Sequence, residues 1–274
     1  MQIWSEMTRL RSPPVLIIES DAGWDINIRA IMSRLNTHFI DFLNQINSTV
    51  VHDGSFGSPN NHKVHGSPSY SPIQPNPDDP WLSEHWDVFM MGQCIEHSQD
   101  ENIRLVYEDE DVPAGTDYWG EKLGRKRVIR KSGGPTCTTA YAISHTGAAK
   151  LLLRSALDLD NPVDYLIRKL VMSRDLVAYS LIPPVMVQWE YVDGIGMGER
   201  GAQSDIRGGK HKDTPEDADM PGWKYVKERA SVWTIKGLYG NVVPERVALD
   251  EAWTEIIGAE RKKFEESLWN PETN

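Results

Sequence analysis

One short stretch near the start of the chain, residues 15–25 (VLIIESDAGWD), most constrains how this sequence can fold. Its apolar run is preceded by two prolines and closed by Glu19, Ser20 and Asp21, here called the acidic corner. An apolar run of this length between proline and polar residues predicts a buried strand of a parallel sheet. Carboxylates two residues apart at the end of such a strand lie where open α/β sheets bind ligands, and they can hold a divalent cation. The spacing alone favours a simpler alternative, a loop whose acids cap the next helix, because two-carboxylate motifs often arise by chance.

The residues after the acidic corner alternate between helical and strand patterns. Asp25 is a candidate N-cap, and the apolar residues after it recur at helical spacing until about Asn47. These apolar residues are Ile28, Ile31, Met32, Leu35, Phe39, Phe42, Leu43 and Ile46. Apolar runs at residues 86–92 and 137–144 predict two further core strands. Strand, helix and further strands in this order predict an α/β domain.

Two more helices are predicted between residues 144 and 172. Ser144 is placed to cap a helix through residues 147–153, whose small first residues allow close packing on the sheet. Pro162 stands at the first helical position that proline favours, and Asp164 falls in the first turn, where the helix dipole favours a carboxylate. Residues 176–188 then predict a strand, a Pro-Pro break and another extended segment.

A long polar segment, residues 50–80, is rich in Ser, Pro, Gly and Asn and predicts a surface loop. Its three histidines could in principle bind a metal; they are His52, His62 and His65. A polar loop is the favoured interpretation, because these histidines keep no ligand spacing.

Two charged runs are also interpreted as ordinary surface structure rather than as binding sites. The acidic residues 108–111 predict a solvated turn, and the basic residues 122–131 predict a hairpin with Val128 and Ile129 inside, although they could face phosphate.

Composition narrows the classes of partner. The formal net charge of -11 argues against a nucleic-acid partner, although a bound metal would still permit a substrate phosphate. No apolar run is long enough to span a bilayer.

Cys94 and Cys137 lack the spacing of zinc ligands, and they could pair in a secretory compartment or stay reduced in the cytosol. The N-terminus carries no signal segment, and its helical apolar spacing without a cap leads us to expect that the chain begins inside a domain.

Five pieces of the sequence, in this order, resemble glycosyltransferase family 25, which includes bacterial lipooligosaccharide galactosyltransferases, collagen galactosyltransferases and many fungal relatives. They are residues 15–25, 86–94 (WDVFMMGQC), 137–152 (CTTAYAISHTGAAKLL), 161–170 (NPVDYLIRKL) and 183–189 (PPVMVQW). The most specific is the tyrosine-containing strand followed by S-x-x-G-A-x-K-L-L. The tryptophan content and the spacing from Asp21 to Asp25 most resemble the fungal branch.

The resemblance covers residues 1–207 and implies a GT-A-like, Rossmann-like domain with a mostly parallel sheet flanked by helices. Residues 208–274 lie outside the resemblance and are expected to form an irregular or helical C-terminal extension, with one helix over about residues 247–268. The resemblance also implies metal-dependent, inverting transfer of a hexose, often galactose, from a UDP-sugar to a glycan or glycoprotein acceptor, usually with manganese. Carried over to this chain, Glu19 and Asp21 would contact the metal and the nucleotide diphosphate. Asp164 would contact the acceptor or act as the general base. A eukaryotic member is expected in the secretory pathway (ER or Golgi), and a bacterial one in the cytoplasm.

The chain departs from the family pattern at two points. The family's acidic motif is usually E-D-D, and Ser20 replaces the middle acid here. The family's opening strand lies upstream of this motif, so we expect that the first strand is absent from this chain, which would expose an apolar sheet edge. The alternative hypothesis is therefore a catalytically inactive, truncated relative that binds a partner or a glycan. A metal-dependent hydrolase that uses Asp21 and the loop histidines ranks last, because no ligand spacing supports it.

Overall fold

The computed structural model describes the central sheet, its covering helices and part of a second sheet. The described residues are 2–19, 22–52, 72–74, 76–94, 96, 103–112, 116–118, 121–157, 161–191, 233–235, 248, 251 and 255. Several predictions therefore fall outside the described residues: the two acidic-corner residues Ser20 and Asp21, most of the polar segment 50–80 with His62 and His65, and most of the extension 208–274.

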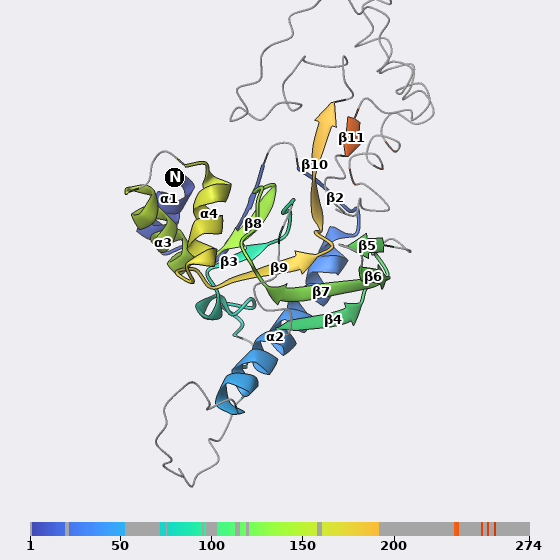
Figure 1. Cartoon of the computed structure of the whole chain (residues 1–274), viewed down its shortest axis with the longest axis horizontal. Coiled ribbons are helices and arrows are strands. Elements are labelled where there is room, and N and C mark those ends of the chain that lie inside the picture. The colour runs from blue at the N-terminus through green and yellow to red at the C-terminus, as the bar shows by residue number, and fades with distance from the viewer. Residues whose placement is uncertain are drawn as a thin grey trace, which may run out of the picture.

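A six-stranded sheet lies at the centre of the described chain, in the order β1-β8-β3-β9-β7-β4 (Figure 1). Its strands are β1 (Val15–Ile18), β3 (Val88–Met90), β4 (Arg104–Glu108), β7 (Lys126–Lys131), β8 (Ala140–Ile143) and β9 (Ala178–Ile182). β3 and β9 pair in parallel, and the other neighbouring strands pair antiparallel. Strands β1, β3, β9 and β4 therefore run in one direction, and β8 and β7 run in the other.

These pairings confirm the predicted mixed α/β architecture with a sheet flanked by helices. The prediction of mostly parallel pairing is wrong for this sheet, because β8 is inserted antiparallel between β1 and β3, and β7 between β9 and β4. The error has a simple cause. An apolar run does not encode the direction of its strand, since pairing in either direction can bury the same side chains.

Helix α2 (Ile28–His52) covers one face of the sheet with the apolar stripe predicted for it. Phe39 lies at the centre of this layer. Its ring stacks on Phe89 of β3 at a centroid distance of 4.6 Å and meets the edge of Tyr179 of β9 at 5.6 Å. The helix was expected to end near Asn47, and it continues to His52.

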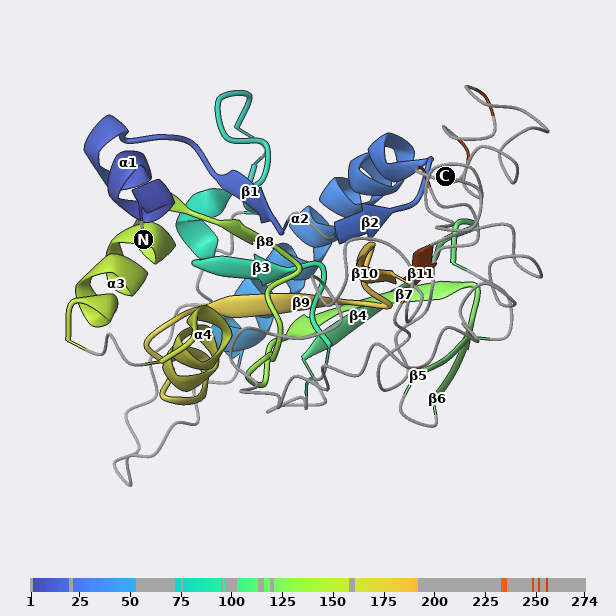
Figure 2. The ribbon, with the colours of Figure 1, turned by 90° about the horizontal axis from the view of Figure 1, so that it is seen from above.

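Three shorter helices cover the opposite face: α1 (Gln2–Leu10), α3 (His145–Ser155) and α4 (Val163–Met172). Figure 2 shows α2 and α4 on opposite sides of the sheet. The predicted N-terminal helix is confirmed as α1, which buries Trp4 and Met7. The Ser144 side chain caps α3 by accepting the Gly147 N–H at 3.0 Å, as predicted. A Cβ at Gly147 would lie 2.2 Å from the Asp87 carbonyl oxygen, so only glycine allows α3 to approach the start of β3 this closely.

Strand β1 differs from the prediction of a buried strand. It lies at the edge of the described sheet, with β8 as its neighbour. The side chains of Leu16 and Ile18 are 38% and 41% exposed. They lie on the face that α2 covers, but the α2 core is centred on Phe89 and Tyr179, two or more strands away. The apolar composition of β1 is therefore only half used for burial, and an uncharged edge of this kind is open to pairing with another strand.

A second sheet extends from the end of β9 and consists of β2 (Ala22–Trp24), β10 (Met186–Tyr191) and β11 (Trp233–Ile235), with β10 in the middle. Both outer strands pair antiparallel with β10. The expected strand, Pro-Pro break and extended segment in residues 176–188 are confirmed as β9, the break and β10. Strand β11 belongs to the predicted C-terminal extension, so part of that extension adds a strand to this sheet. The described residues Ala248, Glu251 and Glu255 are helical, within a region where the apolar pattern also indicates helix.

Smaller elements complete the described chain: a 3-10 turn, Ser83–His85, and a two-stranded sheet of β5 (Thr116–Tyr118) and β6 (Glu121–Gly124). The predicted hairpin over residues 122–131 is not formed, because β6 pairs with β5 while β7 joins the central sheet. Val128 and Ile129 are both buried, as expected, on opposite faces of the sheet. Among the described helices, none is long and apolar enough to cross a membrane.

The acidic run 108–111 contains a buried ion pair, so the prediction of a solvated turn is wrong for part of it. Asp109, which follows β4, is 1% exposed and accepts a 2.5 Å hydrogen bond from Arg127 of β7. Arg34 of α2 bonds both Asp109, at 2.8 Å, and Asp111. Arg127 also donates to the Pro183 carbonyl oxygen at 2.7 Å, just after β9. This network ties α2, β4, β7 and β9 together at one end of the sheet.

The charges in this network set the protonation of Asp109. Burial by itself would raise the pKa of the Asp109 carboxyl. The charge of Arg127 and hydrogen bonds from Arg127, Arg34 and the Asp111 backbone outweigh that effect, so this pKa lies below its ordinary value. Asp109 is therefore ionised at neutral pH and neutralised by its partners.

Candidate functional site

The candidate site lies at the edge of the central sheet where β1, β3 and β9 end and β8 begins. Glu19 follows β1 directly, and Gly92 lies two residues after β3. The chain after β9 is tied to the same edge, because the Met91 carbonyl oxygen accepts the N–H groups of Val185 and Met186 at 3.0 and 3.1 Å. Gly92 permits this close packing, since a Cβ there would lie 2.7 Å from the Ala140 nitrogen. This edge is the one expected for a ligand site in an open α/β sheet.

Glu19 is fixed at this edge by its backbone and by its side chain. Its N–H donates to the Thr139 carbonyl oxygen at 3.0 Å, which continues the pairing of β1 with β8. Its Oε1 accepts a 2.6 Å hydrogen bond from the Thr138 hydroxyl. Glu19 is an exposed residue, whereas Thr138 is buried. The Glu19 carboxylate is therefore hydrogen-bonded on the side that faces the protein interior.

The simpler alternative for the acidic corner was that its acids cap the next helix. Among the residues that the structure describes, the Glu19 side chain accepts a hydrogen bond from Thr138 beside β8 rather than from an N–H at the start of α2. Asp25 instead holds the turn before α2, where its Oδ1 accepts the Asn27 N–H at 2.8 Å and its carbonyl accepts the Ile28 N–H. The prediction of Asp25 as N-cap is therefore wrong by two residues, because the first helical hydrogen bond runs from the Ile31 N–H to the Asn27 carbonyl oxygen.

Asp164 stands in the first turn of α4, as predicted. Its Oδ2 accepts the Cys137 N–H at 3.3 Å, and its Oδ1 accepts the N–H of its neighbour Tyr165 at 2.8 Å. The side chain is half-buried. Asp164 thus connects the start of α4 to the segment that leads into β8.

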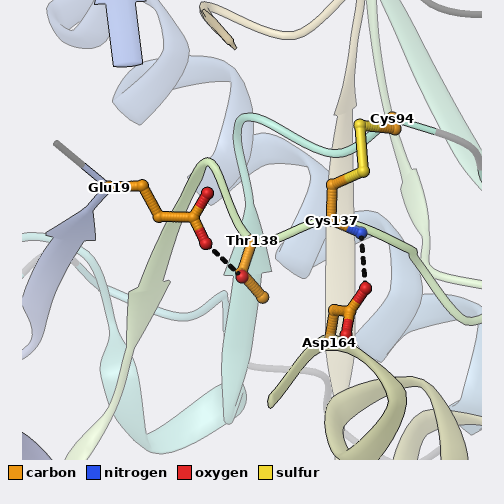
Figure 3. Close-up of a disulfide and its surroundings, with 5 residues drawn as sticks. All are labelled: Glu19, Cys94, Cys137, Thr138 and Asp164. Atoms are coloured by element: carbon orange, nitrogen blue, oxygen red, sulfur yellow. Dashed lines mark hydrogen bonds between the residues drawn. A yellow bond between two sulfur atoms is a disulfide. The ribbon is translucent and has the colours of Figure 1, made fainter. Parts of the chain in front are cut away.

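Cys137 and Thr138 form one short strip, to which two of the three predicted acidic site residues are bonded. Figure 3 shows Glu19 pointing to Thr138 on one side and Asp164 pointing to the Cys137 nitrogen on the other. Glu19 and Asp164 lie 145 positions apart in the sequence (164 - 19), and each is bonded to one of two consecutive residues of this strip. The position of Asp21, the third predicted site residue, lies outside the described residues.

A disulfide between Cys94 and Cys137 anchors this strip to the end of β3 (Figure 3). Cys94 also donates its N–H to the Thr136 carbonyl oxygen at 2.9 Å. Cys137 has a φ of +64°, a left-handed conformation that is unfavourable for a residue with a Cβ. The sequence left pairing and reduction both open, and the structure pairs the two cysteines.

Tyr141 lies in β8 beneath the strip. Burial raises the pKa of Tyr141 to about 12; a hydrogen bond from the Trp4 side chain opposes this rise, and the charge of Glu19 adds to it. The phenol is therefore protonated at neutral pH. Trp4 of α1 thus packs beside Tyr141 of β8.

Sequence reasoning missed Thr138, Tyr141 and the disulfide as parts of this site. One signal was present in the sequence. Cys94 closes the apolar run of β3 and Cys137 opens that of β8, so adjacency of the two strands would have placed the cysteines together. That adjacency is a property of the tertiary fold, which the residue pattern does not state.

The donor chemistry at the corner fits a hard divalent cation in part. Glu19 offers carboxylate oxygen, and ligating carboxylates are usually hydrogen-bonded by a neighbour as Thr138 does here. Among the described residues, no three His, Cys, Asp or Glu side chains gather as a metal site. A second acidic ligand at the corner would be Asp21, and Ser20 supplies no carboxylate.

Comparisons with models of protein families, with curated proteins and with solved structures find no match to this chain.

Proposed function

We propose that this chain is a GT-A-type glycosyltransferase that transfers a hexose, often galactose in the family it resembles, from a UDP-sugar to a glycan or glycoprotein acceptor with inversion. The observation that carries the proposal is the bonding of Glu19 and Asp164 to the same strip at the carboxyl edge of the sheet. Such an arrangement holds the proposed donor-side carboxylate and the proposed acceptor-side carboxylate on either side of one strip, so that the two are fixed relative to each other.

The two carboxylates would have different roles. Glu19, with Asp21, would hold a divalent metal, manganese in the resemblance, which neutralises negative charge that develops on a leaving diphosphate. Such a cation would also offset the local acidity of the corner toward a diphosphate, in a chain whose formal net charge is -11. Asp164 would accept the proton of the attacking acceptor hydroxyl. The disulfide suits an oxidising compartment such as the ER or Golgi.

A second candidate function is a non-catalytic protein of this fold that binds a glycan or a protein partner. Two observations favour it. Both oxygens of Asp164 already accept backbone N–H groups, which is what a purely structural helix-start carboxylate does. Ser20 also removes one acid from the motif that the resemblance implies.

The variant Asp164→Asn separates these roles. If Asp164 is the general base, we expect the substitution to lower the transfer rate about 100-fold or more while donor affinity stays within about twofold. The measurement is transfer from a panel of UDP-hexoses to glycan acceptors, with donor affinity measured in parallel. The matched control is Asp175→Asn, an exposed acid just beyond the other end of α4, which should change neither quantity. A fall in donor affinity as large as the fall in rate would make Asp164 a donor-site or structural residue.

A further inference from the structure

We infer that strand β1 is the interface of a symmetric homodimer, in which two copies of this chain pair antiparallel along this strand with Ile17 on the twofold axis. β1 is an outer strand of the described central sheet, with β8 on one side and no described strand on the other (Figure 2). Pairing of two such strands would join two six-stranded sheets into one continuous sheet. The inference is independent of the proposed function, because it uses none of the carboxylates of the candidate site.

The first argument is the direction of the backbone groups of β1. Glu19 donates its N–H to the Thr139 carbonyl oxygen, which continues the antiparallel register of β1 with β8. Backbone groups alternate between the two sides of an antiparallel strand, so those of every second residue before Glu19 also point toward β8. The N–H and carbonyl groups of Leu16 and Ile18 therefore point away from β8. Two donors and two acceptors face the outer edge of the strand.

The second argument is a contrast between the two outer strands of the sheet. β4, at the other edge, carries the exposed charged residues Arg104 and Glu108, and such charges are a common means of preventing edge strands from pairing. β1 carries neither a charge nor a proline over Val15–Ile18. Its side chains Leu16 and Ile18 are apolar and more than one third exposed. The outer edge of β1 therefore lacks the protection that the other edge has, and a pairing partner would cover apolar surface.

The third argument identifies a second copy as the partner, because β1 complements itself in one register. With Ile17 opposite its own copy, Leu16 lies opposite the partner's Ile18, and the outward backbone groups of these two residues meet as hydrogen-bonded pairs. Their exposed side chains then contact each other on one face of the joined sheet. A register with Leu16 opposite its copy would instead place Ile18 opposite Pro14, which has no N–H to donate.

The symmetry of this pairing limits the assembly to two chains. A twofold pairing uses the same strand of both copies and closes, and the other outer strand of the described central sheet is the charged β4. The acids that flank the interface do not oppose it strongly. In the proposed register the two copies of Glu19 lie four residues apart along the paired strands, about 13 Å, which exceeds the screening length at physiological ionic strength.

Sedimentation equilibrium of the wild-type chain tests the dimer. A strand of four residues gives a small interface, so we expect reversible dimerisation within a range of about 1–500 µM. Leu16→Lys should weaken dimerisation about tenfold or more, because it places a charge on the apolar edge, and should leave the monomer folded, because Leu16 is 38% exposed. The matched control is Val106→Lys, which places the same charge at a 45% exposed position of β4 and should leave the dimer unchanged.

A cross-linking measurement tests the register and does not depend on the lysine variants. In the proposed register the two copies of Ile17 form a non-hydrogen-bonded pair whose Cα atoms lie about 4.5 Å apart, within the range of a disulfide. Ile17→Cys should therefore cross-link the dimer under mild oxidation. Val15→Cys, at about 13 Å from its copy, should not. The two native cysteines are bonded to each other and do not compete.

Dimers that Leu16→Lys weakens and Val106→Lys does not, together with cross-linking of Ile17→Cys alone, would support the inference. A wild-type chain that stays monomeric up to about 500 µM would overturn it, and this is also the result expected if another segment of the same chain pairs with β1. A dimer on which the two lysine variants have equal effects would place the interface elsewhere. Equal cross-linking of the two cysteine variants, or none in either, would contradict the register. If Leu16→Lys does not fold, Ile18→Lys replaces it.

Discussion

Replacing Asp109 by Asn should lower the free energy of unfolding by about 3–5 kcal/mol, the cost typical of removing one partner of a buried ion pair. The substitution keeps nearly the same volume, so the loss does not come from a cavity. It leaves the Arg127 guanidinium, with a side chain 3% exposed, without its charged partner. It also weakens the bond to Arg34, which ties α2 to the sheet. Urea-induced unfolding of the two proteins measures the difference.

The matched control is Glu110→Gln, an acid one residue away whose side chain is 82% exposed and which lies 3.7 Å from Arg34. Its loss should stay within about 0.5 kcal/mol. The effect of Asp109 should also depend on pH. Because its folded pKa lies below the ordinary carboxyl value, its stabilising contribution is present above about pH 4 and is lost as the pH falls through the folded pKa. The difference between wild type and Asp109→Asn should therefore be constant near neutral pH and shrink below about pH 4. A difference that is absent at pH 7 would show that the pair does not stabilise the fold.

Loss of the Cys94–Cys137 disulfide should destabilise the protein by about 2–5 kcal/mol, the range for native disulfides. The cysteines are 43 residues apart, and the chain-entropy relation gives about 4 kcal/mol for a loop of that size. The enthalpic strain at Cys137, with its φ of +64°, could reduce this value. Denaturant unfolding of wild type with and without a reductant measures the effect.

The control is the double variant Cys94→Ala/Cys137→Ala, whose unfolding should not respond to the reductant and should match that of reduced wild type. Thiol labelling under denaturing conditions should detect no free thiol in the oxidised protein, because both cysteines are in the disulfide. Free thiols in the purified oxidised protein, or unfolding that the reductant leaves unchanged, would contradict the pairing.

The elements themselves could be predicted well from the sequence. The stripe from Ile28 to Ile46 predicted the buried face of α2, because a helix of this length repeats its apolar contacts many times. Ser144 marked the start of α3 through local capping chemistry, which acts within a few residues. Pro162 marked the start of α4 as well, although it directly precedes the first helical residue, Val163, and makes no side-chain cap bond. Such signals need no knowledge of the rest of the fold.

Pairing between distant segments could not be predicted in the same way. The apolar residues of β1 predicted a core strand, yet β1 lies at the edge of the described sheet. The position of a strand in a sheet depends on its pairing with segments that are distant in the sequence. Asp109 read as a solvated acid, since Arg127 and Arg34 come from other elements. The same holds for the candidate site. Glu19 was selected by its place at the end of a predicted strand and Asp164 by the family resemblance, but the strip of Cys137 and Thr138 that joins them is a tertiary contact.

The most direct test of the central claim, a metal-dependent nucleotide site at the acidic corner, is calorimetric titration of the purified chain with UDP, with and without Mn²⁺. We expect binding that requires the metal and that Asp21→Asn abolishes, because that carboxylate would contact the cation and the diphosphate. The result that would contradict the account is UDP binding that Mn²⁺ and Asp21→Asn leave unchanged, or no UDP binding by the wild-type chain in the presence of Mn²⁺.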